Sequence, residues 1–157
     1  TVSIGSTQNL SAELFKSVTG IEAQIVPFKG TPALIAGLRS NSIDVIFEFL
    51  PPVLSQVRGN AVKALAVASA QRFPGLPDTP TAAESGVPGF QVSSWNAVSV
   101  RANTPRPIVD RLNREIVAAL NSADVKQKLQ DLGAEARTST PEQTRELMVS
   151  ESPGGRR

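Results

Sequence analysis

Three short apolar runs, separated by helical patterns, constrain the fold of this chain more than any other feature. The runs are residues 21–28, 45–50 and 64–68, and the last two are almost continuously apolar. Continuous apolar runs are typical of strands that are covered on both faces of a parallel sheet. Helical periodicity between the runs gives the order strand, helix, strand, helix, strand, which indicates right-handed βαβ units. The sequence therefore predicts an α/β fold, with a small, mainly parallel sheet and helices on both faces.

Apolar residues recur with a helical period in several segments. They predict helices over residues 9–18, 31–39, 53–58, 107–121 and 124–132, a last helix that begins at 140–141, and a short one over 81–85. Capping residues, prolines in first turns and glycines after last turns mark the ends of these helices. Residues 90–100 alternate between apolar and polar, and we expect them to form a strand that crosses from one region to another.

The turn between residues 25 and 34 is the first candidate binding site. An apolar run ends at Gly30, and we expect Thr31 to cap the helix that follows, with Pro32 as its first residue. The first turn of such a helix leaves N–H groups without partners at a positive helix end, where an anion can bind. The same residues also suit an ordinary strand-to-helix connection that binds nothing.

The composition excludes several classes of function. The chain has no cysteine and no histidine, which removes disulfides, thiolate and histidine metal sites, and catalysis by Ser–His or Cys–His pairs. The carboxylates show neither a metal-ligand spacing nor a paired arrangement, so we predict no enzyme, cofactor or metal site. A net charge of +2, with basic residues spread along the chain, gives no reason to expect nucleic-acid binding. No apolar run reaches the roughly 18 residues of a transmembrane helix.

Several sequence motifs resemble, in the same order, those of a known family. They are Phe-Lys-Gly-Thr at residues 28–31, Ile-Asp-Val-Ile-Phe at 43–47, Lys-Ala-Leu-Ala-Val at 63–67, and Leu-Pro-Asp-Thr-Pro-Thr-Ala-Ala-Glu-Ser-Gly at 76–86. Together they resemble the Bug-type substrate-binding proteins of tripartite tricarboxylate transporters, over about residues 1–150. The last motif, rich in proline and ending in Glu-Ser-Gly, is the most distinctive.

The resemblance implies a periplasmic solute receptor with a type II periplasmic-binding-protein-like fold, in which two α/β lobes enclose a ligand. Such a receptor is not an enzyme and needs no cofactor; its partners would be a small carboxylate or amino-acid ligand and membrane transporter subunits. Residues 1–94 would form the ligand-binding second lobe, and residues 95–151 the crossing strand and C-terminal helices of the first lobe. The chain would then lack the N-terminal half of that first lobe. Residues 152–157 contain no packing residue, and we predict a disordered tail there.

The resemblance places the ligand contacts in two turns and at the end of the second apolar run. The predicted ligand-binding residues are Gly5, Ser6, Asn9, Gly30, Thr31, Ala33 and Glu48. Asn9 stands where the family usually has histidine, and Pro32 removes an N–H group that could reach a carboxylate. Glu48 is part of a pair that replaces the family's Asp-Asn. If Glu48 faces the ligand, it would repel a dicarboxylate or favour a ligand that carries an amine.

Some of the predicted ligand-binding residues, and two residues outside that set, also have a purely structural interpretation. Asn9 is a good helix N-cap, Glu48 is typical of a solvated carboxylate at the end of a strand, and Lys29 is typical of a surface lysine. Trp95, the only tryptophan, could serve as hinge packing. The alternative function is a truncated remnant that acts as an assembly or interaction module without binding ligand.

The helix predicted over residues 107–121 carries an apolar stripe. Its members are Ile108, Leu112, Ile116, Val117 and Leu120. The resemblance implies that this stripe packs on strands of the first lobe that the chain does not contain. Each large side chain left in water forgoes on the order of 1.5–3 kcal/mol, so we predict a homodimer, with or without exchanged C-terminal helices. Folding of these helices back onto the chain's own sheet is the alternative.

Overall fold

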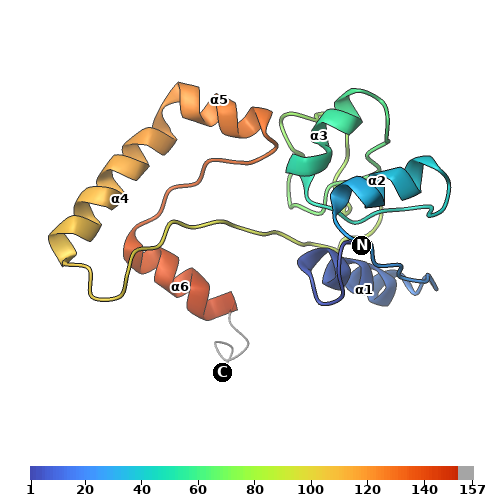
Figure 1. The fold of residues 1–157 in the computed structure, drawn as a ribbon, viewed down its shortest axis with the longest axis horizontal. Helices are drawn as coiled ribbons and strands as arrows, with labels where there is room; N and C mark the ends of the chain where they lie inside the picture. Colours follow the sequence, from blue (N-terminus) through green and yellow to red (C-terminus); the bar gives the residue numbers. More distant parts are fainter. Residues whose placement is uncertain (152–157) are drawn as a thin grey trace. The chain divides into compact units, whose positions relative to one another are not determined.

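The computed structural model describes residues 1–151 of the 157-residue chain and consists of two compact units. The N-terminal unit comprises Thr1–Ser94, and the C-terminal unit begins at Trp95 (Figure 1). The assignment of these units to the lobes of a receptor stays a prediction. The expected disordered tail, residues 152–157, lies outside the described residues.

Three helices of the N-terminal unit form close to where the sequence predicts them. They are α1 (Thr7–Thr19), α2 (Thr31–Arg39) and α3 (Leu50–Arg58). α1 is closed by Gly20, whose left-handed φ of 70° lets its N–H donate to the Lys16 carbonyl oxygen at 2.8 Å. α3 accommodates two prolines in its first turn, because the N–H groups at that position have no partner within the helix.

The expected parallel sheet is not formed by the described residues. They contain no strand, and the one bridge assigned among them joins Val67 to Thr81 in the parallel sense. Residues 21–28 and 64–68 lie outside any helix, and 45–50 reaches only the first residue of α3. A strand exists only where a neighbouring segment supplies backbone N–H and C=O partners, and an apolar run does not specify that neighbour.

Two residues nevertheless pair as they would in a parallel sheet. The N–H and carbonyl oxygen of Val67 bond to the residues on either side of Thr81, both at 2.9 Å. Thr1 donates to the Val26 oxygen at 3.1 Å and accepts the Phe28 N–H at 2.9 Å. In a parallel pair, one residue bonds to both neighbours of the residue that it faces. The direction of these two pairings therefore agrees with the expected parallel sheet, although no ladder of further hydrogen bonds extends from either of them.

The core of the N-terminal unit is a cluster of three phenylalanines, accompanied by small and branched aliphatic side chains. Ring centroids lie 5.4 Å apart between Phe15 of α1 and both other rings, and 5.9 Å apart between Phe47 and Phe90. The rings meet tilted or edge-on, as aromatic pairs prefer. The buried apolar residues are Ala12, Leu34, Val53, Leu54, Ala82 and Phe90. All three helices and the turn-rich segment that follows them therefore contribute to this core.

A single turn replaces the short helix expected over residues 81–85, so that prediction is wrong. The Thr81 N–H donates to Glu84 Oε2 at 2.8 Å, and the Glu84 N–H donates to Thr81 Oγ1 at 3.1 Å. The Arg72 guanidinium donates to the same carboxylate at 2.9 Å, and this hydrogen bond is the main reason why the pKa of Glu84 lies below its usual value. Gly86, with a φ of 92°, ends the turn before a helix can extend.

The C-terminal unit contains the remaining helices that the described residues form. They are α4 (Arg106–Asn121), α5 (Ala123–Asp131) and α6 (Pro141–Glu151), and α4 contacts α5. Ser122 Oγ accepts the Val125 N–H at 3.4 Å at the start of α5. Thr140 and Gln143 cap α6 by exchanging backbone-to-side-chain hydrogen bonds of 2.9 and 3.1 Å. The strand expected over residues 90–100 is not formed.

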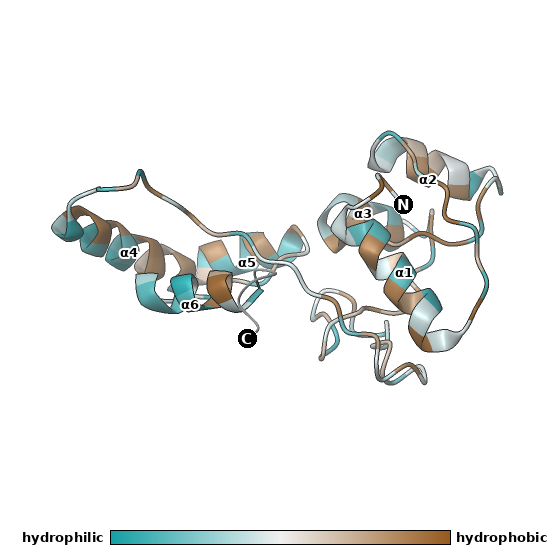
Figure 2. Cartoon of the chain, turned by 90° about the horizontal axis from the view of Figure 1, so that it is seen from below, coloured by the Kyte–Doolittle hydropathy of each residue, from teal (hydrophilic) through white to brown (hydrophobic). Residues whose placement is uncertain are grey.

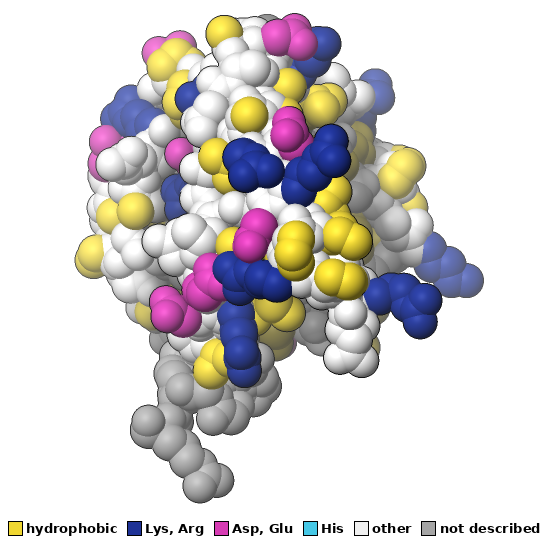
Figure 3. Space-filling model, turned by 90° about the vertical axis from the view of Figure 1, so that its left-hand side faces the viewer, with side chains coloured by type: hydrophobic (Ala, Val, Ile, Leu, Met, Phe, Trp, Pro, Cys, Tyr) yellow, Lys and Arg dark blue, Asp and Glu magenta, His cyan; other side chains and the backbone are white. Residues whose placement is uncertain are grey.

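Apolar side chains of the C-terminal unit remain at the surface. Not one described residue after Ser94 is buried. In the stripe of α4, Ile108 is 50% and Leu112 41% exposed, and the other three members are half-buried. Figure 2 shows hydrophobic positions along α4, and Figure 3 shows hydrophobic side chains among charged ones on one face of the molecule. None of the helices within residues 1–151 is long and apolar enough to cross a membrane.

Candidate functional site

The start of α1 brings together three of the predicted ligand-binding residues. Gly5 has a φ of 80° and donates its N–H to Asn9 Oδ1 at 2.9 Å. Ser6 is the N-cap: its Oγ accepts the Asn9 N–H at 3.1 Å, and its hydroxyl donates to the Ser3 oxygen at 2.7 Å. The interpretation of Asn9 as the N-cap is therefore wrong, because Asn9 is the third residue of the helix and closes the turn from within.

The side chain of Asn9 is buried, and only one of its two polar atoms makes a hydrogen bond within residues 1–151. Only 8% of the residue is exposed, and its oxygen is taken by Gly5. Its amide nitrogen makes no hydrogen bond with any described residue, so its two N–H donors remain for ligand oxygens.

The start of α2 is arranged differently from the expectation. Gly30, with a φ of 87°, is the N-cap, and Thr31 is the first helical residue, so capping by Thr31 is a wrong prediction. The Thr31 hydroxyl instead donates to Glu48 Oε2 at 2.9 Å. The N–H groups of Thr31 and Ala33 make no hydrogen bond within residues 1–151, and Pro32 has none to offer. Two unused donors therefore lie at the positive end of α2.

Glu48 connects the starts of α1 and α2. Its Oε1 accepts hydrogen bonds from Gln8 Nε2 at 2.7 Å and from the Phe49 N–H at 2.8 Å. Its Oε2 accepts the Thr31 hydroxyl, so Gln8, Thr31 and Glu48 form a continuous bridge, here called the Glu48 bridge. α3 begins two residues after Glu48, so this carboxylate lies near three positive helix ends, which favour negative charge. Glu48 is half-buried and accepts three hydrogen bonds, so its carboxylate is held by the protein, and its contact with a ligand stays a prediction.

Gln8 belongs to the Glu48 bridge, although the sequence analysis did not predict it. It lies 40 residues from Glu48 in the chain. No local pattern links a glutamine at the start of one helix to a carboxylate that precedes another. The one available signal was its position beside Asn9, in a turn that was already a candidate.

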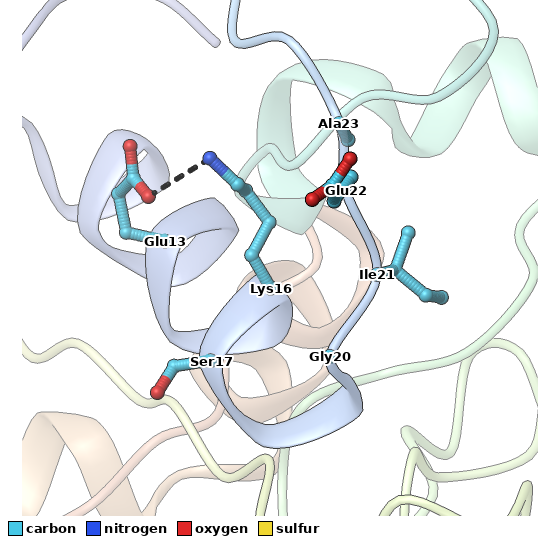
Figure 4. A pocket seen from close by; sticks show the side chains of 7 residues that line it. All are labelled: Glu13, Lys16, Ser17, Gly20, Ile21, Glu22 and Ala23. Carbon is cyan, nitrogen blue, oxygen red and sulfur yellow. Dashed lines mark ion pairs between the residues drawn. The ribbon is translucent and has the colours of Figure 1, made fainter.

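An open pocket of about 380 Å³ lies at the C-terminal end of α1. It is lined by Glu13, Lys16, Ser17, Gly20, Ile21, Glu22 and Ala23 (Figure 4). Lys16 pairs with Glu13 at 3.3 Å, so its charge is already matched. The pocket includes none of the seven predicted ligand-binding residues, and its mixed charges select no class of ligand.

The remaining residues of interest lie apart from the Glu48 bridge. Lys29 is exposed, as a surface lysine would be. Trp95 donates its indole N–H to Glu151 Oε2 at 2.9 Å, within the C-terminal unit. No group of acidic side chains that could hold a metal ion lies within residues 1–151. The two helix starts thus offer two unused N–H groups, the amide nitrogen of Asn9 and one carboxylate, which are groups that can pair with a small polar ligand.

The chain matches one family model almost from end to end. Residues 1–154 match the tripartite tricarboxylate transporter family receptor. BugT of Bordetella pertussis is 35% identical over 148 residues, which cover 94% of this chain and 45% of BugT. The chain spans about half the length of BugT and of a second curated relative, a UPF0065 protein of Pseudomonas sp., at 45% of each.

Two solved structures extend this likeness to three dimensions. Rpa4515 of R. palustris, solved with adipate, is 35% identical with a TM-score of 0.86, over 96% of this chain and 50% of that one. MatC of Rhodopseudomonas palustris, solved with bound malate, is 35% identical with a TM-score of 0.71, over 90% of this chain and 48% of that one. The resemblance inferred from the motifs is thus confirmed: the chain belongs to the receptor family of tripartite tricarboxylate transporters, a family of solute-binding proteins.

Proposed function

We propose that this chain is a ligand-binding part of a periplasmic receptor that recognises a small carboxylate or amino acid and delivers it to a tripartite tricarboxylate-type transporter. The observation that carries the proposal is the Glu48 bridge, which holds two helix starts together beside unused N–H donors. The family is one of receptors, so we propose no catalytic role. The relatives solved with adipate and malate support a carboxylate as the ligand class.

The contacts to ligand are divided between the two helix starts. The free N–H groups of Thr31 and Ala33 and the amide nitrogen of Asn9 are the donors that a ligand carboxylate would use. The polar groups of Gly5 and Ser6 are already engaged in the turn, so we propose that these residues shape the site. Gly30 gives the backbone the positive φ that begins α2.

The N-terminal unit would be one lobe of a type II receptor fold, and the C-terminal unit the return into the other lobe. The boundary between the units after Ser94 and the match to about half of each relative support this division. Binding sites usually enclose most of a small ligand. Contacts from one lobe leave much of the ligand in water, so we expect a Kd on the order of 1 mM for this chain alone.

Titration calorimetry with a panel of small carboxylates tests the proposed function. We expect weak but saturable binding that Thr31→Val reduces, because the substitution keeps the shape of the side chain and removes the hydroxyl of the Glu48 bridge. Thr138→Val is the matched control, since Thr138 is exposed and lies in the C-terminal unit. Absence of binding across the panel, or equal losses in both variants, would contradict the proposed site.

The exposed stripe of α4 favours a second candidate role, in assembly. Ile108 and Leu112 expose about half of their surface, and such side chains gain free energy when a partner covers them. We propose that a second copy of the chain supplies this cover in a homodimer. Sedimentation at micromolar concentration tests it: Leu112→Asp should shift a dimer to monomer, and a monomeric unsubstituted chain would contradict the proposal. A dimer without ligand binding would favour the assembly role over the receptor role.

A further inference from the structure

We propose that Glu48 selects the ligand by charge, so that the site prefers a carboxylate that also carries an amine over a dicarboxylate. This inference rests on the proposed function, because it assumes that ligand binds at the starts of α1 and α2. It concerns the class of ligand and the residue that determines it.

Glu48 keeps room for one more hydrogen bond. A carboxylate has about four acceptor positions, and the bonds from Gln8, Phe49 and Thr31 fill three of them. Oε1 carries two of these bonds and Oε2 carries one, so the remaining position is on Oε2, beside Thr31. An ammonium group can donate to that position. A carboxylate can only accept hydrogen bonds, so it would meet Glu48 as a like charge with no shared hydrogen.

The donors around Glu48 are arranged to hold its charge in place. Gln8 and Thr31 come from two different helices, and the Phe49 N–H fixes the carboxylate from its own backbone. Rotation of Glu48 away from an incoming carboxylate would break bonds to both helices. The charge is therefore a fixed feature of the site, and the ligand has to match it.

The unused donors of α2 supply the other half of the recognition. The N–H groups of Thr31 and Ala33 suit the carboxylate of the ligand, while Oε2 of Glu48 suits its amine. A ligand with one group of each kind satisfies both parts of the site. A dicarboxylate such as adipate satisfies the N–H groups and places its second charge against Glu48 or in water.

A matched pair of ligands tests this directly on the full chain. Adipate and ε-aminocaproate have the same number of carbon atoms and differ in whether the far end carries a carboxylate or an amine. We expect ε-aminocaproate to bind at least about tenfold more tightly, the size of effect that a single charge contact in a partly screened site can produce. Glu48→Gln should reduce this preference by about tenfold or reverse it, because it removes the charge and keeps an acceptor oxygen.

Glu22→Gln is the matched control, since Glu22 is an exposed carboxylate of the same unit and lines the pocket at the other end of α1. It should leave the preference unchanged. The preference of the unsubstituted chain is a readout that needs no variant, so the inference stays testable even if Glu48→Gln unfolds. Adipate bound as tightly as ε-aminocaproate would overturn the charge selection while leaving the proposed function in place. No binding of either ligand to any variant would overturn both.

Discussion

Both units of this chain form helices, but they differ in whether their described residues form a buried core. The N-terminal unit has a buried core with Leu34 fully covered, and its long-range hydrogen bond between Gln8 and Glu48 is partly buried. In the C-terminal unit, no described residue is buried, and its ion pairs lie at the surface. Caps and periodicity therefore specify helices locally in both units, whereas a core requires a partner surface, which among residues 1–151 the N-terminal unit alone supplies.

The largest expected effect is on the core of the N-terminal unit. Leu34→Ala should lower the free energy of unfolding by about 2–5 kcal/mol, because it leaves a cavity in a packed core. Leu112→Ala, on the exposed stripe of α4, should cost the monomeric chain less than about 1 kcal/mol. Urea denaturation followed by circular dichroism measures both. Equal losses would mean that α4 is packed as tightly as α2 in solution.

The Glu48 bridge should give the next largest effect. Glu48→Ala leaves the donors of Gln8, Thr31 and Phe49 without their acceptor, and we expect a loss of about 1–3 kcal/mol. The comparison is Glu142→Ala in the C-terminal unit, which removes an exposed ion pair with Arg106 and should change stability little. A neutral Glu48→Ala variant would show that the bridge does not hold the two helix starts together.

Helix capping should affect the two units alike, because it is local. Ser6→Ala removes the cap of α1, and Thr140→Ala removes that of α6. Each should cost about 1 kcal/mol of helix stability. Amide hydrogen exchange in the first turns of α1 and α6 measures the two losses separately. A large difference between them would mean that capping and tertiary packing are coupled in one unit.

The smallest expected effect is on acid stability, and it too should appear in both units. The hydrogen bond from Arg72 lowers the pKa of Glu84, and that from Arg106 lowers the pKa of Glu142. Because each folded pKa lies below its ordinary value, each pair stabilises the fold at pH values above the ordinary pKa of a glutamate side chain. This contribution is lost as the pH falls through the folded pKa.

NMR titration of the side-chain carboxyl groups tests the assignment of these shifts. Arg72→Gln should raise the pKa of Glu84 towards its ordinary value and leave that of Glu142 unchanged. Both carboxylates are exposed, so the change in stability should be small in each case. An unchanged pKa of Glu84 in the variant would show that Arg72 is not its main partner.

The helices could be predicted because their signals are local. Thr140 with Gln143 and the proline-led starts of α2, α3, α4 and α6 all lie within one or two turns of the helices they begin. Strands cannot be predicted from local signals in the same way, because a run such as residues 64–68 needs a neighbouring segment to pair with. Within residues 1–151, Val67 forms a single bridge. Thr31 was expected to cap α2, but its hydroxyl donates instead to the carboxylate of Glu48, which lies 17 residues further along the chain.

The candidate site was predictable in part. The motifs identified the family and indicated the turns at Gly5 and Gly30 as candidate sites. Glu48 was predicted as a ligand contact because it departs from the family pattern. Gln8 could not be found, because its role depends on a contact over 40 residues. The unused N–H groups of α2 follow from the rules of helix ends, but the unused amide nitrogen of Asn9 required the structure.

A map of the amide NMR shifts that ε-aminocaproate causes across the whole chain tests the location of the site most directly. We expect saturable shifts centred on Gln8, Thr31, Ala33 and Glu48 in the N-terminal unit. We expect none of comparable size in α4, α5 or α6. Shifts centred on those three helices, or on the pocket around Lys16 and Glu22, would contradict the claim that the function lies at the joined starts of α1 and α2.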